Sequence, residues 1–194
     1  MDIPSFLRWL QGTGLAARIR DSLFVFPLLE SAHVIGLALV FGTIAVIDLR
    51  LLGVASTERS FQRMASDILK WTWAAFALTA LTGSLMFTTN AVVYSHNFYF
   101  RAKIVLLVLA GINVLVFELT AGRTIHRWDR APSAPPIGRA VATLSLVIWI
   151  AVIFAGRIIG FTTTRASAEP APININFEDL LGLPADSGQK TPAR

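Results

Sequence analysis

The chain has 194 residues, of which 54% are hydrophobic and only 15% are charged, a composition typical of a membrane protein. It contains no cysteine, which excludes disulfides, thiolate metal sites, c-type haem attachment and iron–sulfur clusters. The net charge of +5 comes from basic residues that are spread over every loop and form no patch with interleaved aromatic residues. Nucleic-acid binding is therefore disfavoured.

The N-terminal residues 1–22 are expected to form an interfacial amphipathic segment. Residues 1–11 lack the features of a signal peptide, since they contain an acid at position 2, a proline and no small-residue cleavage site. Their mixture of apolar and polar side chains is typical of a short helix that lies in the membrane interface: Phe6, Leu7, Trp9 and Leu10 against Asp2, Arg8 and Gln11.

Four long apolar segments follow, at residues 23–47, 70–90, 102–120 and 140–161. Each approaches or exceeds the ~20 residues that a helix needs to cross a bilayer. We therefore expect an all-α integral membrane protein, with four transmembrane helices in an antiparallel bundle over residues 23–163. Residues 164–194 are rich in Pro, Ala and small polar residues and are expected to form an extended or disordered tail, with an apolar stretch at 173–183 that suits partner docking.

Four spans place both termini on the same side of the membrane. The loops at 48–70 and 119–139 hold eight Lys or Arg residues, against six near the span ends on the other side. Because cytoplasmic loops carry the excess of basic residues, we expect a multi-pass protein of a bacterial inner membrane with both termini in the periplasm.

Small residues recur at four-residue spacing and predict close helix packing. They fall on the first, second and fourth spans: Ala32 and Gly36; Ala75, Thr79 and Gly83; Gly156 and Gly160. Asn113, in the middle of the third span, is expected to face inward and bond a neighbouring helix.

Polar residues that packing does not explain gather in one half of the membrane. Charged and titratable groups at membrane depth are costly, so they are candidates for a functional site. In an antiparallel bundle these residues lie in the same, outer half of the membrane: Glu30, His33, Met86, Lys103 and Arg157. The loop that covers this half adds His96.

Three interpretations of this cluster stay open. In the first, His33 is an axial ligand of haem b oriented by Glu30, Met86 or His96 is the second ligand, and Lys103 and Arg157 hold the propionates. In the second, His33 and Met86 bind copper, with His96 as a third ligand. In the third, no cofactor is bound, and a buried Glu30–Arg157 ion pair beside His33 fixes helix packing.

Other chemistry finds less support in the sequence. A di-iron bundle needs two Glu-x-x-His motifs, and only Glu30 to His33 provides one. No Gly-rich phosphate loop, HExxH pair or nucleophile elbow is present, so an enzyme is not expected. A transporter of four spans without discontinuous helices would have to oligomerise.

Four stretches carry a resemblance to a known family: LESAHVIGLALVFGTIAVIDLRLLG, LKWTWAAFALTALTGSLMF, NFYFRAKIVLLVLAGINVLVFE and AGRIIGF. Over residues 1–163 the chain resembles an uncharacterised bacterial four-helix inner-membrane family, catalogued as a domain of unknown function, which implies no assigned chemistry. Through His33 to Gly36 it is more distantly similar to copper-resistance D-type membrane proteins and small b-type cytochromes.

The preferred hypothesis is a small, non-enzymatic membrane subunit that binds haem b or copper and serves electron transfer or metal handling in a larger assembly. The alternative is a cofactor-free structural subunit. The expected partners are the lipid bilayer and either other membrane subunits or further copies of this chain.

Overall fold

The computed structural model describes residues 2–167, with side chains through residue 163. The described residues are helical and contain no strand, which confirms the all-α class. Seven helices and two shorter helical segments follow in order: α1 (Ile3–Gln11), α2 (Gly14–Asp21), α3 (Val25–Leu52), α4 (Phe61–Thr89), α5 (Ala91–His96), α6 (Phe98–Leu119), the 3-10 turn η1 (Gly122–Thr124), α7 (Ile125–Trp128) and α8 (Pro136–Ser167). The predicted docking stretch at 173–183 lies outside the described residues.

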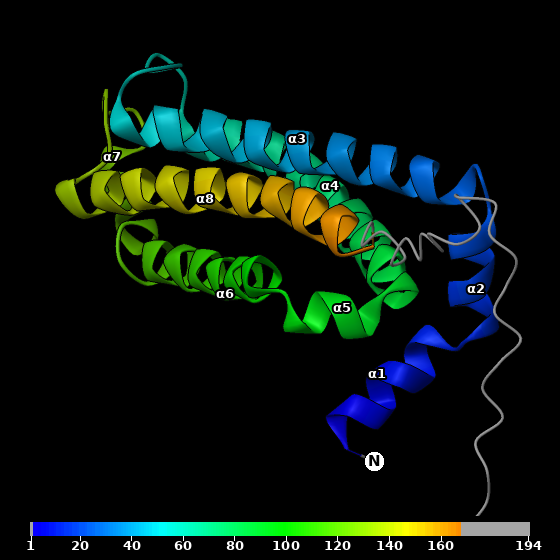
Figure 1. The fold of residues 1–194 in the computed structure, drawn as a ribbon. Helices are drawn as coiled ribbons and strands as arrows, with labels where there is room; N and C mark the ends of the chain where they lie inside the picture. The colour runs from blue at the N-terminus through cyan, green and yellow to red at the C-terminus, as the bar shows by residue number, and fades with distance from the viewer. Residues whose placement is uncertain (1, 168–194) are drawn as a thin grey trace, which may run out of the picture.

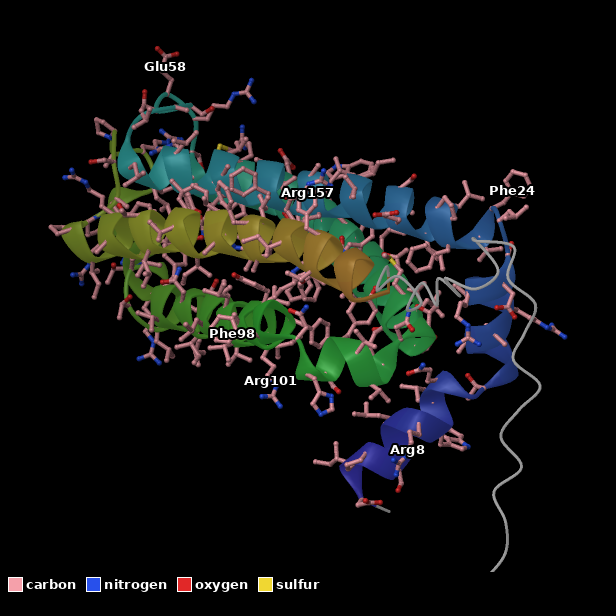
Figure 2. All side chains as sticks on the ribbon, viewed as in Figure 1. Arg8, Phe24, Glu58, Phe98, Arg101 and Arg157 are labelled. Carbon is pink, nitrogen blue, oxygen red and sulfur yellow. The ribbon has the colours of Figure 1, made fainter. Side chains whose placement is uncertain are left out.

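The four long helices run along the length of the molecule, and the short ones gather at its ends (Figure 1). Helix α3 packs against α4 and α8, and α6 packs against α8. The end that holds α1, α2 and α5 is called the α5 end here, and the opposite end, with α7 and the α3–α4 loop, is called the Arg50 end. Figure 2 labels Phe24 at the α5 end and Glu58 at the Arg50 end.

Three stretches are long and apolar enough to cross a membrane: Val25–Leu52, Phe98–Trp128 and Pro136–Thr163. Three of the four expected spans are thus confirmed as capable of spanning. Helix α4 has 29 residues but starts with a polar section that carries Arg63, Asp67 and Lys70. The three apolar stretches expose large aliphatic side chains such as Ile35, Val105 and Val147, which suits contact with lipid.

Small side chains let α3 and α4 approach closely, as the sequence predicts. A Cβ on Gly36 would lie 2.5 Å from Thr79 Oγ1, and a Cβ on Gly83 would lie 2.8 Å from the His33 ring. Gly160 does not follow this prediction, because a Cβ there would meet nothing within 4 Å. The central core joins all four long helices: Val40, Ala75, Ala110, Ile148, Trp149 and Val152.

Asn113 faces inward as predicted and is only 6% exposed. Its side-chain Nδ2 donates to the Val141 carbonyl at 3.1 Å and so bonds α6 to α8. A polar side chain that bonds a neighbouring helix in this way adds specificity to packing among apolar surfaces.

Arg50, one of the basic residues in the predicted 48–70 loop, is fully buried. Its guanidinium donates to the carbonyls of Arg59, Asp129, Ala131 and Pro132, at 3.0 to 3.4 Å. The five N–H groups of arginine suit this role, because they satisfy the backbone of two loops at once. The loops after α3 and after α7 are thereby joined into one end of the molecule.

Gly53 makes the sharp exit from α3 possible. It ends the helix with a left-handed conformation at φ 77°, and a Cβ there would lie 2.9 Å from Ser133 Cβ. Glycine alone accepts this conformation at no steric cost, and here it also lets the two loops touch.

Candidate functional site

His33 is held between α3 and α4 by one ring nitrogen. The half-buried ring places Nδ1 3.0 Å from the Thr79 carbonyl and 3.1 Å from Thr82 Oγ1. A carbonyl can only accept, so in the neutral ring Nδ1 carries the proton and donates it. The lone pair then lies on Nε2, which leaves that nitrogen able to accept a hydrogen bond or bind a metal.

Gly83 provides the room for this ring on α4. A Cβ at position 83 would lie 2.8 Å from His33 Cε1 and 3.2 Å from Nδ1. Such separations are closer than packed atoms tolerate, so any side chain at position 83 would displace the imidazole.

Lys103 enters the same region from α6. Its side chain is half-buried, and its Nζ would lie 3.7 Å from a Cβ added to Gly156. Its charge interacts electrostatically with His33. Among residues 2–163 the ammonium has no hydrogen-bond or ion-pair partner. A partly desolvated cation without a counter-charge is costly and attracts an anionic group.

Glu30 lies one turn before His33 but does not orient its ring; the Thr79 carbonyl does so instead. The Glu30 carboxylate is exposed and interacts electrostatically with Tyr94 of α5. Burial raises the pKa of Tyr94, and the negative charge of Glu30 raises it further. The structure thus does not place Glu30 in the orienting role that the first interpretation gives it.

Arg157, labelled in Figure 2, is exposed on α8. Its guanidinium lies 4.8 Å from the centroid of the Phe161 ring. The structure does not form the buried Glu30–Arg157 ion pair of the third interpretation. In the described part of the chain, the recorded ion pair joins Arg20 to Asp21 instead. Both Glu30 and Arg157 are exposed, and stacking on an aromatic face gives the guanidinium a favourable neighbour.

Met86 and His96 are not joined to His33 by hydrogen bonds in the described region. Met86 is half-buried on α4, one turn beyond Thr82. His96 is exposed on α5, and its Nδ1 lies 2.9 Å from the Val92 carbonyl. No group of three His, Asp or Glu side chains within residues 2–163 is arranged to hold a metal ion. The structure thus brings together His33 and Lys103 and leaves the other candidates around them.

Asp48 is a buried carboxylate on α3, just beyond the first predicted span at residues 23–47. It is 5% exposed, it interacts with Ser145 of α8, and its Oδ2 has no hydrogen-bond partner. Its signal in the sequence is the acid and base pair Asp48 and Arg50 at the end of an apolar run. Both side chains are buried.

The three apolar helices and the polar groups between them define a multi-pass membrane protein. The chain belongs to the Family of unknown function (DUF6644), whose sequence profile matches residues 15–162. No curated protein and no solved structure matches this sequence. Neither copper-resistance D-type proteins nor b-type cytochromes are therefore among the matches.

Proposed function

We propose that this protein is a small, non-enzymatic membrane subunit in which His33 would hold one haem b through its free ring nitrogen. The hydrogen bond from Nδ1 to the Thr79 carbonyl carries this proposal. Histidines that bind metals commonly donate the other ring N–H to a carbonyl or carboxylate, which fixes the ring and raises the basicity of the ligating nitrogen.

Lys103 favours haem over copper. Its unpaired ammonium beside His33 would repel a copper ion that brings no negative charge, whereas it would attract a haem propionate. Bound haem would supply one-electron exchange, and the polypeptide would hold the His33 ring, fix its ligating nitrogen and balance the propionate charge. Met86 is the proposed second ligand, because it is half-buried on the helix that holds the His33 ring.

We propose in addition that α4 is a fourth span and that the long helices form an antiparallel bundle. The 29 residues of α4 reach about 43 Å at 1.5 Å per residue, which is enough to cross a bilayer. Its packing against α3 through Gly36 and Gly83 supports this arrangement. The basic residues favour a bacterial inner membrane with both termini in the periplasm.

The test is an absorption spectrum of the purified full-length protein and of two matched variants. We expect the wild-type chain to show a Soret band, His33→Ala to lose it, and His96→Ala to keep it. A Soret band that survives His33→Ala would refute the assignment of the ligand.

A colourless wild-type protein would support the cofactor-free structural subunit instead. The observation that favours this second candidate is the tight contact of His33 with Gly83 and Thr79, which by itself fixes the register of α3 against α4.

A further inference from the structure

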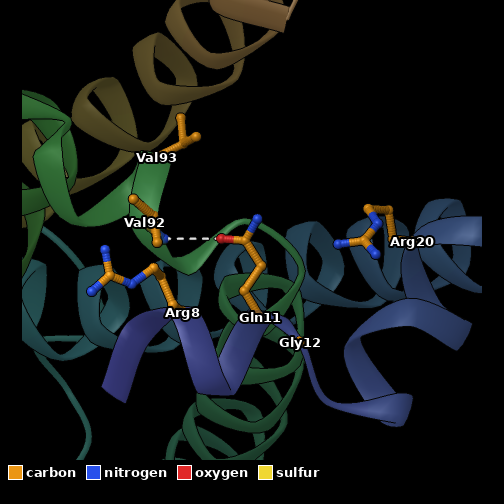
Figure 3. Close-up of a pocket in the computed structure, with 6 residues that line it drawn as sticks. All are labelled: Arg8, Gln11, Gly12, Arg20, Val92 and Val93. Atoms are coloured by element: carbon orange, nitrogen blue, oxygen red, sulfur yellow. Dashed lines mark hydrogen bonds between the residues drawn. The ribbon is translucent and has the colours of Figure 1, made fainter. Parts of the chain in front are cut away.

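A cavity of about 450 Å³ opens at the α5 end, away from His33. It lies between α1, α2 and α5, and Figure 3 shows Gln11 with the two arginines on either side of it. The lining residues are Arg8, Gln11, Gly12, Arg20, Val92 and Val93.

The cavity is positively charged, because two guanidiniums line it and no carboxylate does. Arg8 donates to Ser5 Oγ at 3.4 Å; Arg20 donates to the Thr89 carbonyl at 3.4 Å and pairs with the exposed Asp21 at 3.5 Å. These contacts are long, and each guanidinium has five N–H donors. Most of the donors therefore stay available to an anion.

Gln11 contributes a third donor. Its Oε1 accepts from the Val92 backbone N–H at 3.3 Å, a bond that ties α1 to α5. With the oxygen engaged, the side-chain NH₂ is left for a ligand. Arginine and amide donors that converge on one space suit the oxygens of a phosphate group.

Helix α1, which lines the cavity through Arg8 and Gln11, is suited to the membrane interface. Helix α1 exposes Ile3, Phe6 and Trp9 at 77, 45 and 57%. A short helix with such a face lies in the interface, and tryptophan is enriched at that depth. Val92 and Val93 add an apolar wall beside the arginines. A ligand with an anionic head and an apolar body matches both parts.

We infer that this cavity binds the phosphate group of an anionic phospholipid at the membrane surface. The two arginines and Gln11 hold the phosphate, and Val92 and Val93 contact the glycerol and acyl region. This site is separate from the proposed haem site, since His33, Lys103 and Gly83 are not among its lining residues.

The experiment measures lipid binding to the detergent-purified full-length protein by native mass spectrometry, with phosphatidylglycerol and phosphatidylcholine as probes. We expect phosphatidylglycerol to bind preferentially, and Arg8→Gln and Arg20→Gln each to weaken its binding by about tenfold, as the loss of a charged hydrogen bond predicts. Arg18→Gln is the matched control, because Arg18 is exposed on α2, carries the same charge and does not line the cavity. It should bind as the wild type does.

Three results would overturn the inference. Equal binding of phosphatidylcholine would show that no anionic head is recognised. An equal loss in Arg18→Gln would reduce the effect to net charge. Displacement of phosphatidylglycerol by millimolar inorganic phosphate would identify a site for the free ion. Thermal unfolding of each variant without lipid verifies the fold, and Arg8→Gln alone suffices if loss of the Arg20 bond to Thr89 prevents folding.

Discussion

Gly83 leaves on α4 the room that the imidazole of His33 needs. Replacing Gly83 with alanine would place a Cβ 2.8 Å from His33 Cε1 and force the ring or the helices apart. We expect Gly83→Ala to destabilise the protein by about 1–3 kcal/mol, the usual cost of overpacking, and to displace His33 from Thr79. Thermal unfolding in detergent measures this loss.

Gly42→Ala is the control for this prediction. Gly42 lies on the same helix as His33, and a Cβ there would meet nothing within 4 Å. Gly42→Ala therefore gains helix propensity without a clash. If Gly83→Ala is as stable as Gly42→Ala, the close packing of the His33 ring is refuted.

Arg50 holds two loops through their backbone carbonyls. Arg50→Gln would leave buried carbonyls without a donor, and we expect a loss on the order of 3 kcal/mol in the free energy of unfolding. Arg59→Gln is the control, because the Arg59 side chain is exposed and only its carbonyl binds Arg50. Denaturant unfolding of both variants checks the prediction, which fails if they are equally stable.

Among the helices, α4 has its N-terminus capped by Asp129, from the loop that follows α7. Asp129 Oδ1 accepts from the Gln62 backbone N–H at 2.8 Å, and Oδ2 accepts from the Ser60 hydroxyl at 2.6 Å. The Phe61 N–H also donates to the Asp129 carbonyl, at 3.0 Å. These bonds satisfy N–H groups that the first turn of a helix leaves free, and so attach α4 to the loop before α8.

This cap makes stability depend on pH. Donation from Gln62 and Ser60 lowers the pKa of Asp129 below its ordinary value of 3.8. A carboxyl with a lower pKa in the folded state stabilises fully above its unfolded pKa, and the contribution is lost as the pH falls through the folded value. We expect the melting temperature to fall as the pH drops below about 4, and Asp129→Asn to be less stable at pH 7 by about 1 kcal/mol.

Melting curves between pH 7 and pH 2 check this expectation. Asp67→Asn is the control, because Asp67 is an exposed carboxylate on the same helix. The cap has no thermodynamic role if Asp129→Asn melts as the wild type does at every pH.

Across the whole molecule, apolar length predicted three spanning helices and small-residue spacing predicted the close approach of α3 and α4, because the two follow directly from the thickness of the bilayer and from backbone approach. The inward position of Asn113 was predicted because a polar side chain in the middle of a span is expected to bond a neighbouring helix. The burial of Arg50 could not be predicted, since it depends on carbonyls from loops about 80 residues further along the chain. Which group orients His33 likewise depends on the rotation of α4 about its axis.

The proposed fourth span has a topological consequence. If α4 crosses the bilayer, the α3–α4 loop and α5 lie on opposite sides. The chain has no cysteine of its own, so Glu58→Cys and His96→Cys place single thiols at these two exposed sites. A membrane-impermeant thiol reagent should label only His96→Cys in right-side-out vesicles. Labelling of both variants from one side would show that α4 does not cross.

The proposal that His33 binds haem b is best tested by a reduced-minus-oxidised absorption spectrum of the purified wild-type protein, with haem quantified per chain. We expect a reducible Soret band at close to one haem per chain, lost in His33→Ala. A protein that is colourless after purification from haem-replete cells would refute haem binding.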